Sequence, residues 1–369
     1  MQPRILNVIG TRPKAGIKTV LDNYESSFKK YIIYDFMIFS EESTGLFDIQ
    51  MRNHGREVYL FKSFRIKNIV KLYNDLNDFF KINKDKYNII HIHTPNVAFI
   101  VSPIAKKYGV KIIIGHSHAT KYSDKWSSKV RNFILLINRN AYFTHIGACS
   151  TEALKFLSRF TINKSKIIIK NAIKIEKFKF DYNHREQIRR EYNIENNQIL
   201  VGCIGRFNNQ KNQEFLLSVF KDLKKYSKFH LILIGSGPNK RKLEKYILQH
   251  DMHNVTILDF QNNIHEIYNG LDVLALPSRY EGLPMVAVEA LANGLPILLS
   301  DKITKDLSCI STTYLSIDDK KNWYQAILNT NPISNMKRRE NRILEELDYD
   351  IKVEQRKLLE YYEELINEK

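Results

Sequence analysis

Short apolar segments alternate along this chain with longer segments whose apolar residues recur at helical spacing. Residues 67–82 show the clearest amphipathic helix pattern. In the first half, the segments expected to form buried strands are 5–9, 35–39, 58–61, 89–93, 111–114 and 142–148. Because strands that alternate with helices form parallel sheets, the pattern predicts a doubly wound α/β domain.

The alternation breaks near residue 180 and then starts again. Strands are expected over 199–204, 230–234, 255–258, 272–276 and 296–299, and helices over 214–226, 239–249 and 285–292. The tail is mostly helical, over 336–347 and 350–367. We therefore expect two Rossmann-like domains, 1–180 and 181–349, facing a cleft, with C-terminal helices packing back toward the first domain and 350–369 crossing to it. Ligands of such folds bind at the carboxyl ends of the strands.

The composition is that of an ordinary globular protein. Hydrophobic residues make up 43% of the 369 positions and charged residues 26%. Three cysteines (Cys149, Cys203 and Cys309) are too few for a disulfide framework and lack zinc-ligand spacing, which indicates a reducing compartment. No stretch reaches the ~18 apolar residues of a membrane span, and no cleavage site follows the first apolar run.

The charge is concentrated in the first half. Residues 1–180 hold 31 Lys and Arg against 13 Asp and Glu, whereas residues 181–369 hold 26 against 27. Such an asymmetry indicates an anionic partner for the first half, such as lipid, nucleic acid or an acidic substrate. A basic nucleic-acid-binding protein is disfavoured because no recognisable module is present.

Two loops of the second half have residues that suit an anion. Arg206 and Lys211 follow the strand that ends before Gly205, where they could hold a diphosphate or simply be solvated cations. Gly235 and Gly237 end the next strand, where bare backbone allows a ligand to come close, although a tight turn alone needs the same residues. The full dinucleotide fingerprint is absent, which disfavours an NAD enzyme.

Two glutamates eight residues apart form the sharpest pattern. Glu281 precedes Pro284, which marks the start of a helix, and Glu289 lies inside that otherwise apolar helix. A carboxylate among apolar residues needs solvent or a partner. Hydroxyl groups of a bound sugar could donate hydrogen bonds to both carboxylates. The alternative is that one glutamate interacts only with the dipole of the helix and the other lies on the surface.

Two pairs of histidines end strands of the first half. His91 with His93 and His116 with His118 are spaced so that each pair points one way. A zinc site is disfavoured because no acidic or cysteine ligand accompanies these histidines. Two alternatives remain: the rings form hydrogen bonds inside the core, or one of them donates a hydrogen bond to a hydroxyl or phosphate of a ligand. The first turn is basic and bears Gly16 at the opening of a helix, which suits an anion.

Taken in order, these motifs resemble the retaining family 4 glycosyltransferases of GT-B fold, most closely those that build bacterial capsular, exopolysaccharide or O-antigen repeat units. The resemblance covers nearly the whole chain and is carried by Gly205-Arg206…Lys211, Gly235-x-Gly237 and Glu281-Gly-Leu-Pro…Glu289. One segment departs from the family pattern: Ala15-Gly16-Ile17-Lys18 stands where Gly-Gly-Ala-Glu is usual.

The resemblance implies a role for each matched position. The first domain would bind the acceptor, and the second would bind a nucleotide-sugar donor. The commonest nucleotide in such donors is UDP. Arg206 and Lys211 would hold the diphosphate, Glu281 the transferred sugar, and Glu289 the ribose. Also near the donor would lie Gly282, Leu283, Pro284, Gly235, the backbone near Ile264, and Gly16 from the facing domain. His118, or His116 after a one-residue shift, would line the acceptor side.

The resemblance also implies that the transferred sugar keeps its anomeric configuration. It further implies that the enzyme requires no metal and no other cofactor. The expected acceptor is a saccharide, linked to polyprenyl diphosphate, which places the enzyme in the cytoplasm on the inner face of the cell membrane. The helix expected over 126–138, with Trp126 and Phe133, is either an interfacial helix for an anionic membrane or a core helix. The basic residues that flank it are Lys121, Lys125, Lys129 and Arg131. The alternative function is a GT-B nucleotide-sugar epimerase or hydrolase.

Overall fold

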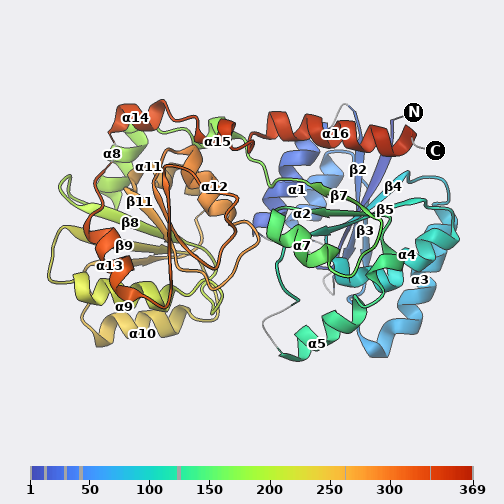
Figure 1. The fold of residues 1–369 in the computed structure, drawn as a ribbon, viewed down its shortest axis with the longest axis horizontal. Helices are drawn as coiled ribbons and strands as arrows, with labels where there is room; N and C mark the ends of the chain where they lie inside the picture. Colours follow the sequence, from blue (N-terminus) through green and yellow to red (C-terminus); the bar gives the residue numbers. More distant parts are fainter. Residues whose placement is uncertain are drawn as a thin grey trace. The chain divides into compact units, whose positions relative to one another are not determined.

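The chain folds into two compact units (Figure 1). The computed structural model describes residues 2–11, 15–28, 31–40, 45–122, 126–261, 263–332 and 334–367. The first unit comprises residues 1–172 and 351–369, and the second comprises residues 173–350. The boundary therefore lies a few residues before the expected one near 180, because the short helix η3 (Ile175–Phe178) packs on helices of the second unit, where the rings of Phe178 and Tyr268 lie 6.1 Å apart.

The first unit contains a seven-stranded parallel sheet in the order β3-β2-β1-β4-β5-β6-β7. Its strands are β1 (Arg4–Ile9), β2 (Ile33–Phe39), β3 (Val58–Phe61), β4 (Ile89–Ile92), β5 (Ile112–Ser117), β6 (His145–Ala148) and β7 (Ser165–Ile168). Its helices are α1 (Ala15–Phe28), α2 (Leu46–Asn53), η1 (Ile66–Asn68), α3 (Ile69–Ile82), η2 (Pro95–Val97), α4 (Ala98–Lys107), α5 (Trp126–Leu135), α6 (Arg139–Tyr142), α7 (Thr151–Ser158) and α16 (Ile351–Asn367).

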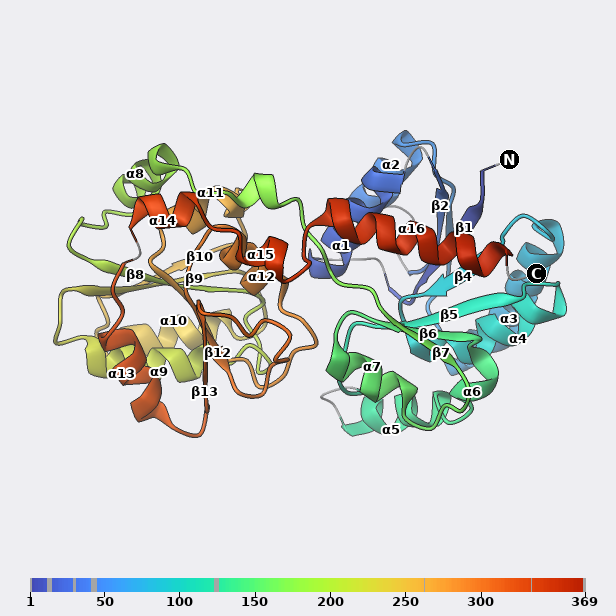
Figure 2. The same cartoon turned by 45° about the horizontal axis from the view of Figure 1, so that its top comes forward.

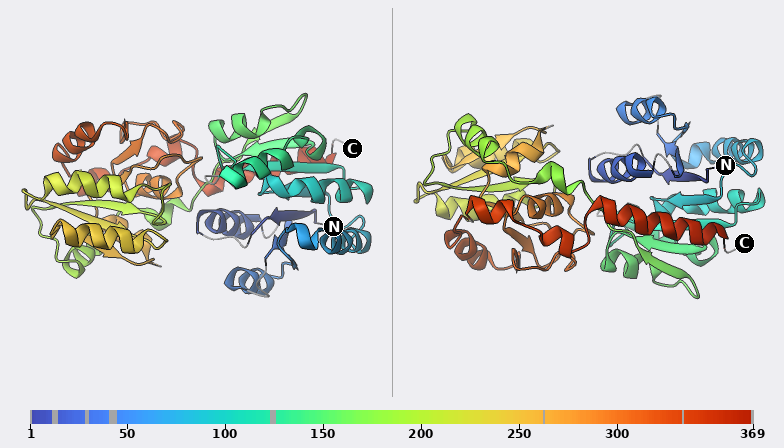
Figure 3. Two further views of the ribbon diagram at one scale, coloured as in Figure 1. Left: turned by 90° about the horizontal axis from the view of Figure 1, so that it is seen from below. Right: turned by 90° about the horizontal axis from the view of Figure 1, so that it is seen from above.

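Helix α16, the last element of the chain, belongs to this first unit. Figures 2 and 3 show it running along the unit, and it packs against α1. Its Tyr362 ring lies 6.4 Å from Phe28 of α1 and 6.3 Å from Tyr34 of β2. Tyr362 is fully buried, so the C-terminal helix is part of the core of this unit.

The second unit contains a six-stranded parallel sheet in the order β10-β9-β8-β11-β12-β13. Its strands are β8 (Ile199–Ile204), β9 (Phe229–Ile234), β10 (Val255–Leu258), β11 (Val273–Leu276), β12 (Ile297–Ser300) and β13 (Thr312–Leu315). Its α-helices are α8 (Tyr182–Glu191), α9 (Gln213–Leu223), α10 (Lys240–Gln249), α11 (Ile264–Gly270), α12 (Met285–Ala292), α13 (Lys320–Leu328), α14 (Asn335–Arg339) and α15 (Ile343–Glu346). Helices α9, α10 and α13 cover one face, and α8, α11, α12 and α14 cover the other (Figure 1).

The doubly wound α/β prediction is confirmed in both units. Each sheet reverses its strand order once, between β1 and β4 in the first unit and between β8 and β11 in the second. Ligand sites of such sheets lie at the carboxyl ends of the strands at this reversal. In the second unit, these strands lead into the loops that contain Arg206, Lys211 and Glu281. In the first unit, β4 leads directly to His93.

Several local predictions were wrong. Strands β7 and β13 were not expected, and each lies at the end of its sheet, where the residues are only partly buried and the apolar pattern is weak. Residues 142–144 were expected in a strand, but Tyr142 ends helix α6 and the strand begins at His145. The single helix expected over 336–347 is two short helices, α14 and α15.

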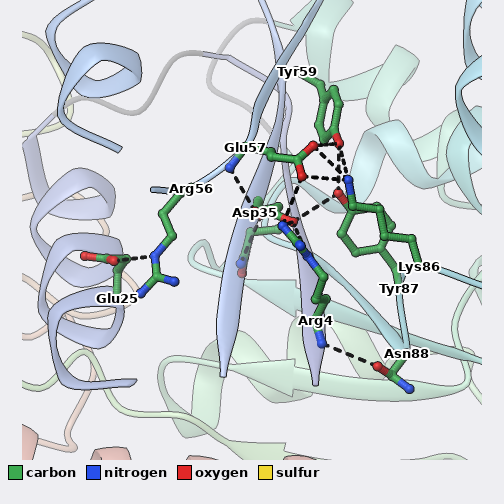
Figure 4. A network of polar contacts seen from close by, with 10 residues as sticks. Arg4, Glu25, Asp35, Arg56, Glu57, Tyr59, Lys86, Tyr87 and Asn88 are labelled. Carbon is green, nitrogen blue, oxygen red and sulfur yellow. Dashed lines mark hydrogen bonds and ion pairs between the residues drawn. The ribbon is translucent and has the colours of Figure 1, made fainter. Parts of the chain in front are cut away.

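An ionic network closes the amino-terminal edge of the first sheet (Figure 4). Arg4 donates from Nε to Asp35 Oδ2 at 3.0 Å and lies 3.1 Å from Glu57 Oε1. Lys86 Nζ binds the same Glu57 carboxylate at 2.7 Å, and Tyr87 donates to Asp35 at 3.2 Å. These contacts tie the starts of β1, β2, β3 and β4 together, so this edge has a structural role and the carboxyl edge is left for a ligand.

Candidate functional site

Hydrogen bonds join the loops that follow β8 and β11. Arg279 N donates to Gln210 O at 2.8 Å, and the Gln210 side chain donates to Tyr280 O at 3.1 Å. Asn212 donates from its side chain to Pro277 O at 3.1 Å and accepts from Arg279 Nη2 at 3.0 Å. Asn212 has a φ of +57°, a value that asparagine tolerates better than most residues. Two loops about 70 residues apart in sequence thus form one rigid platform.

The platform brings Lys211 and Glu281 into contact. Lys211 Nζ lies 2.6 Å from Glu281 Oε1, which also accepts a hydrogen bond from Ser278 Oγ at 2.7 Å. The side chains are only 16% and 9% exposed, so water screens the pair weakly. The sequence predicted both residues for one site, and they do lie together. The pair holds a cation that can bind a phosphate and a carboxylate that can accept sugar hydroxyls.

Arg206 stands at the beginning of the same loop. Its side chain is exposed, and it has no hydrogen-bond or ion-pair partner among the described residues. Its carbonyl oxygen accepts a hydrogen bond from Gln213 Nε2 at 3.1 Å, which fixes the backbone. The guanidinium is therefore available to an anion without breaking an internal contact.

The glycines of this edge are required by contacts inside the protein. Gly235 has a φ of +152°, and a Cβ added there would lie 2.1 Å from the carbonyl oxygen of Gly205. Gly237 has a φ of +155°, and a Cβ there would lie 2.4 Å from Phe207 O. Close packing of two loop backbones therefore explains both glycines, and contact of Gly235 with a nucleotide stays a prediction.

Glu289 is buried on α12 and has a specific partner. Tyr268 of α11 donates from its hydroxyl to Glu289 Oε2 at 2.7 Å, and the glutamate is 8% exposed. Burial raises the pKa of Glu289 to about 7. The sequence analysis required either solvent or a partner for this carboxyl group, and the structure supplies the partner from α11.

The residues before α12 approach the same edge. Glu281 forms an isolated parallel bridge with Ile303, which fixes its backbone, and Pro284 occupies the N-cap position of α12. Gly282 and buried Leu283 lie between them. The first N–H groups of a helix have no partner inside the helix, so they favour an anion near α12. Half-buried Ile264 begins α11, the helix that carries Tyr268.

Arg338 is a buried residue that sequence reasoning missed. It is 3% exposed and donates from its guanidinium to the carbonyl oxygens of Asn269, Leu271 and Tyr268 at 3.3, 3.1 and 3.0 Å. Burial lowers its pKa to about 9. Arg338 thus anchors the end of α11, the helix whose tyrosine holds Glu289. A lone arginine in the tail, far from any motif, gave no sequence signal for this role.

Four histidines at the carboxyl ends of β4 and β5 form two stacked layers, His91 with His116 and His93 with His118. His91 Nε2 lies 3.0 Å from His116 Nδ1, and His93 Nδ1 lies 3.1 Å from His118 Nε2. Within each strand segment the rings stack, with centroids 4.3 Å apart for His91 and His93 and 4.4 Å for His116 and His118. Both pairs point the same way, as the alternation of a strand predicted.

Burial keeps these rings neutral. It lowers the pKa of His91 to about 3 and that of His118 to about 4, and it holds the pKa of His93 and His116 well below the ordinary value. Ring nitrogens of His91, His93 and His116 lie within 4.8 Å of one another. A metal ion there would have to displace the hydrogen bond between His91 and His116, since both nitrogens already share a proton.

Two ring nitrogens of this cluster have no partner among the described residues. They are His116 Nε2 and His118 Nδ1, and both atoms are buried. Of the first turn, Lys18 pairs with Asp22 of its own helix at 2.5 Å and also donates to Gln50 Oε1 of α2 at 3.2 Å. Gly16 lies at the start of α1, and its surroundings fall outside the described residues.

Comparison with known proteins identifies the class. Residues 184–308, which hold the platform and Glu289, match the profile of the family described as glycosyl transferases group 1. The crystal structure of Anabaena Alr3699/HepE in complex with UDP superposes with a TM-score of 0.81 at 15% identity, covering 99% of this chain and 100% of that chain. The chain has the GT-B fold, and its second unit matches a glycosyltransferase family.

Two curated relatives are similar in sequence to this chain. A predicted glycosyltransferase, EpsF of Bacillus subtilis (strain 168), is 27% identical over 311 residues, which are 82% of this chain and 80% of that protein. The UDP-Gal:alpha-D-GlcNAc-diphosphoundecaprenol alpha-1,3-galactosyltransferase of Escherichia coli is 24% identical over 238 residues, which are 60% of this chain and 58% of that protein. Both relatives are named as glycosyltransferases, and the name of the second specifies a diphosphoundecaprenol-linked substrate.

Helix α5 exposes apolar side chains on the surface of the first unit. None of its residues is buried, and Trp126 and Ile134 are 75% and 58% exposed. Of the two alternatives that the sequence left open for this helix, a core helix is therefore contradicted, and the interfacial helix stays a prediction. Lys129 and Arg131 are exposed on the same helix, whereas Lys125 lies outside the described residues. No helix in the described part of the chain is both long and apolar enough to cross a bilayer.

Proposed function

We propose that this enzyme is a retaining family 4 glycosyltransferase that moves a hexose or N-acetylhexosamine from a UDP-sugar to a saccharide acceptor. The platform formed by the loops after β8 and β11 carries the proposal. It brings Lys211 and Glu281 within 2.6 Å and leaves Arg206 of the same loop without an internal partner among the described residues. These are the groups that a sugar diphosphate requires on one surface.

The donor would be held by three kinds of contact. Arg206 and Lys211 bind the diphosphate, while Glu281 accepts hydrogen bonds from the transferred sugar. The backbone of Gly282, Leu283 and Pro284 lies beside the sugar phosphate at the start of α12. Glu289 binds the ribose, and the backbone near Ile264 and Gly235 meets the nucleotide. The UDP bound in the Alr3699/HepE complex supports this choice of nucleotide.

Catalysis follows from charge at the leaving group. As the glycosidic bond lengthens, negative charge grows on the β-phosphate. Lys211 and the amino end of α12 are held in place before the reaction, so they, together with Arg206 of the same loop, stabilise that charge more in the transition state than in the ground state. Two cations can do this without a divalent metal. We therefore propose that the enzyme needs no metal cofactor and that the leaving phosphate takes the acceptor proton.

The first unit would supply the acceptor side. His118 ends the strand region of β5 with one buried ring nitrogen that has no partner among the described residues, and His116 is its neighbour in the same stack. We assign the acceptor contact to His118, with His116 beside it. Gly16 completes the donor phosphate contacts from the first helix in this proposal.

The acceptor is proposed to be a saccharide on polyprenyl diphosphate at the inner face of the cytoplasmic membrane. The name of the Escherichia coli relative, which specifies a diphosphoundecaprenol-linked substrate, supports this class. Exposed Trp126 and Ile134 on α5, together with the surplus of Lys and Arg over residues 1–180, suit an anionic membrane surface.

Thermal-shift screening with nucleotide sugars tests the proposal. UDP-glucose, UDP-galactose and UDP-N-acetylglucosamine are compared with GDP-mannose and with the free nucleotides. A UDP-sugar at a hundred times its Kd should stabilise the protein by about 2.7 kcal/mol. Stabilisation by no UDP compound would refute the donor assignment. Conversion of a bound donor without any acceptor would point instead to an epimerase or hydrolase.

A further inference from the structure

In the hydrogen bonds around His93, the side chain of Asn7 on β1 determines which atom of each pair donates the proton. The Asn7 amide nitrogen lies 3.4 Å from the carbonyl oxygen of Asp35, which can only accept a hydrogen bond. The other amide atom, Oδ1, therefore faces His93 Nε2 at 3.0 Å and must accept a proton from it. His93 consequently has its proton on Nε2.

The direction passes from His93 to His118. A neutral imidazole has one proton, and burial lowers the pKa of His93 well below its ordinary value, so His93 Nδ1 has a lone pair. That lone pair accepts from His118 Nε2 at 3.1 Å. His118, whose pKa burial lowers to about 4, then has no proton on Nδ1. This Nδ1 is the buried atom without a partner among the described residues.

In the layer formed by His91 and His116, no amide group fixes which nitrogen is protonated, as Asn7 does for His93. His116 Nδ1 meets His91 Nε2 at 3.0 Å, and His91 Nδ1 meets the hydroxyl of Tyr362 at 2.7 Å. That hydroxyl lies 3.1 Å from the hydroxyl of Tyr34. A hydroxyl can donate or accept, so this chain can reverse its direction by rotating two O–H bonds. His116 Nε2 can therefore present either a proton or a lone pair.

We propose that Asn7 and His93 hold His118 as a hydrogen-bond acceptor, so that the substrate group it takes is a hydroxyl. A phosphate or carbonyl oxygen, which has only lone pairs to offer, would be repelled by Nδ1. Asn7 and His93 are thus positioning residues, since they act through His118. This inference rests on the proposed function for the identity of the hydroxyl as that of a sugar, whereas the tautomer is a property of the free protein.

Nuclear magnetic resonance of 15N-labelled histidine tests the tautomer directly. Long-range 15N–1H spectra distinguish a protonated from an unprotonated ring nitrogen, and His118→Gln assigns the signals. We expect His118 to be protonated on Nε2 and unprotonated on Nδ1 at pH 7. A proton on Nδ1 of His118 in the wild-type protein would overturn the proposal without any ligand or activity measurement.

Two variants of Asn7 separate positioning from a merely structural role. Asn7→Asp keeps an oxygen toward His93 Nε2, so the tautomer of His118 should be unchanged. Asn7→Leu has a similar size but no acceptor, and His118 should become a mixture of both tautomers. An unchanged spectrum in folded Asn7→Leu would contradict the assigned role of Asn7. If Asn7→Leu does not fold, the wild-type spectrum still decides the tautomer.

Titration with UDP, and then with glucose in the presence of UDP, tests the ligand class. Glucose, as the probe of the acceptor side, should shift the His118 Nδ1 resonance beyond the shift caused by UDP alone, and Nδ1 should stay unprotonated in the complex. Protonation of Nδ1 on binding, or no further shift with glucose, would refute the hydroxyl assignment. If UDP does not bind in the thermal-shift screen, the donor proposal fails while the tautomer result for the free protein stands.

Discussion

At the scale of single residues, the pair of Lys211 and Glu281 has two consequences. In the free protein, each side chain neutralises the other across 2.6 Å in a site that is only slightly exposed. Ligand phosphate would give Lys211 a second anionic partner, while Glu281 would still have Ser278 and the sugar hydroxyls. The lysine is therefore held in place by an anionic partner in both states, which is the condition for electrostatic catalysis without rearrangement.

Replacing Lys211 should lower the rate of transfer. Lys211→Ala removes one preorganised cation from the leaving group, so kcat should fall by ~10²-fold or more. The measurement is initial-rate kinetics with the donor found in the thermal-shift screen. Lys221→Ala, an exposed lysine on α9, is the control and should retain wild-type kcat. Turnover of folded Lys211→Ala within a few-fold of wild type would refute the assignment.

Glu289 should make stability depend on pH. Its pKa is about 7 in the folded protein and ~4.3 in the unfolded chain. The native state therefore binds more protons between these values, and the stabilising contribution, complete below pH ~4.3, is lost as pH rises toward 7. In Glu289→Gln this loss should be absent, a difference of roughly 1–3 kcal/mol. Urea unfolding of both proteins at pH 5 and 7.5 measures it; parallel pH dependences would contradict the assignment.

At the scale of elements, α5 differs from the other long helices of its unit. Helices α3 and α4 bury apolar residues against the sheet, whereas α5 buries none among its ten residues. Its exposed apolar residues and flanking cations match an interfacial helix, which lies in the headgroup region with its apolar side chains in the acyl boundary. Helix α5 thus exposes apolar surface whose contact with water is unfavourable.

Liposome flotation tests α5. Wild-type protein should float with vesicles that contain anionic phosphatidylglycerol at low salt and less at high salt, because the attraction of cations is screened. Trp126→Ala together with Ile134→Ala should weaken flotation. Leu248→Ala, which removes an 80% exposed leucine from α10 of the second unit, is the matched control and should leave flotation unchanged. Flotation that does not depend on the fraction of anionic lipid in the vesicles would contradict the proposal.

Element order could be predicted well from the sequence, and element ends less well. Buried parallel strands are apolar on both faces, so β8, β9 and β11 appear as continuous apolar runs. The outer strands β7 and β13 are partly exposed and mix polar with apolar residues, which hides them. Helices α14 and α15 share one apolar pattern, and the break at residues 340–342 that separates them is not visible in it.

At the scale of the whole molecule, two Rossmann-like units divide the chemistry. The second unit holds the platform, Glu289 and the match to the glycosyl transferases group 1 family. The first unit holds the histidine layers, which are joined to α16 through Tyr362. The C-terminal helix is thus part of the same hydrogen-bonded cluster as β4 and β5, although more than 200 residues separate them in sequence.

Removal of metal ions should leave the activity of the whole enzyme unchanged. The proposed mechanism stabilises the leaving diphosphate with Arg206, Lys211 and the start of α12, so no divalent ion is required. Dialysis against EDTA followed by initial-rate assays should give the rate of untreated enzyme. Loss of activity that returns on addition of Mg²⁺, Mn²⁺ or Zn²⁺ would contradict the mechanism.

The sequence alone determined the α/β class, the presence of two units and the candidate loops, because these depend on local hydrophobic pattern and on short-range spacing. The tertiary structure decided which polar groups meet. It paired Lys211 with Glu281, gave Glu289 the hydroxyl of Tyr268, and set His118 against His93. Such pairs join residues brought together only by folding, so their distances, burial and protonation have no counterpart in the linear pattern.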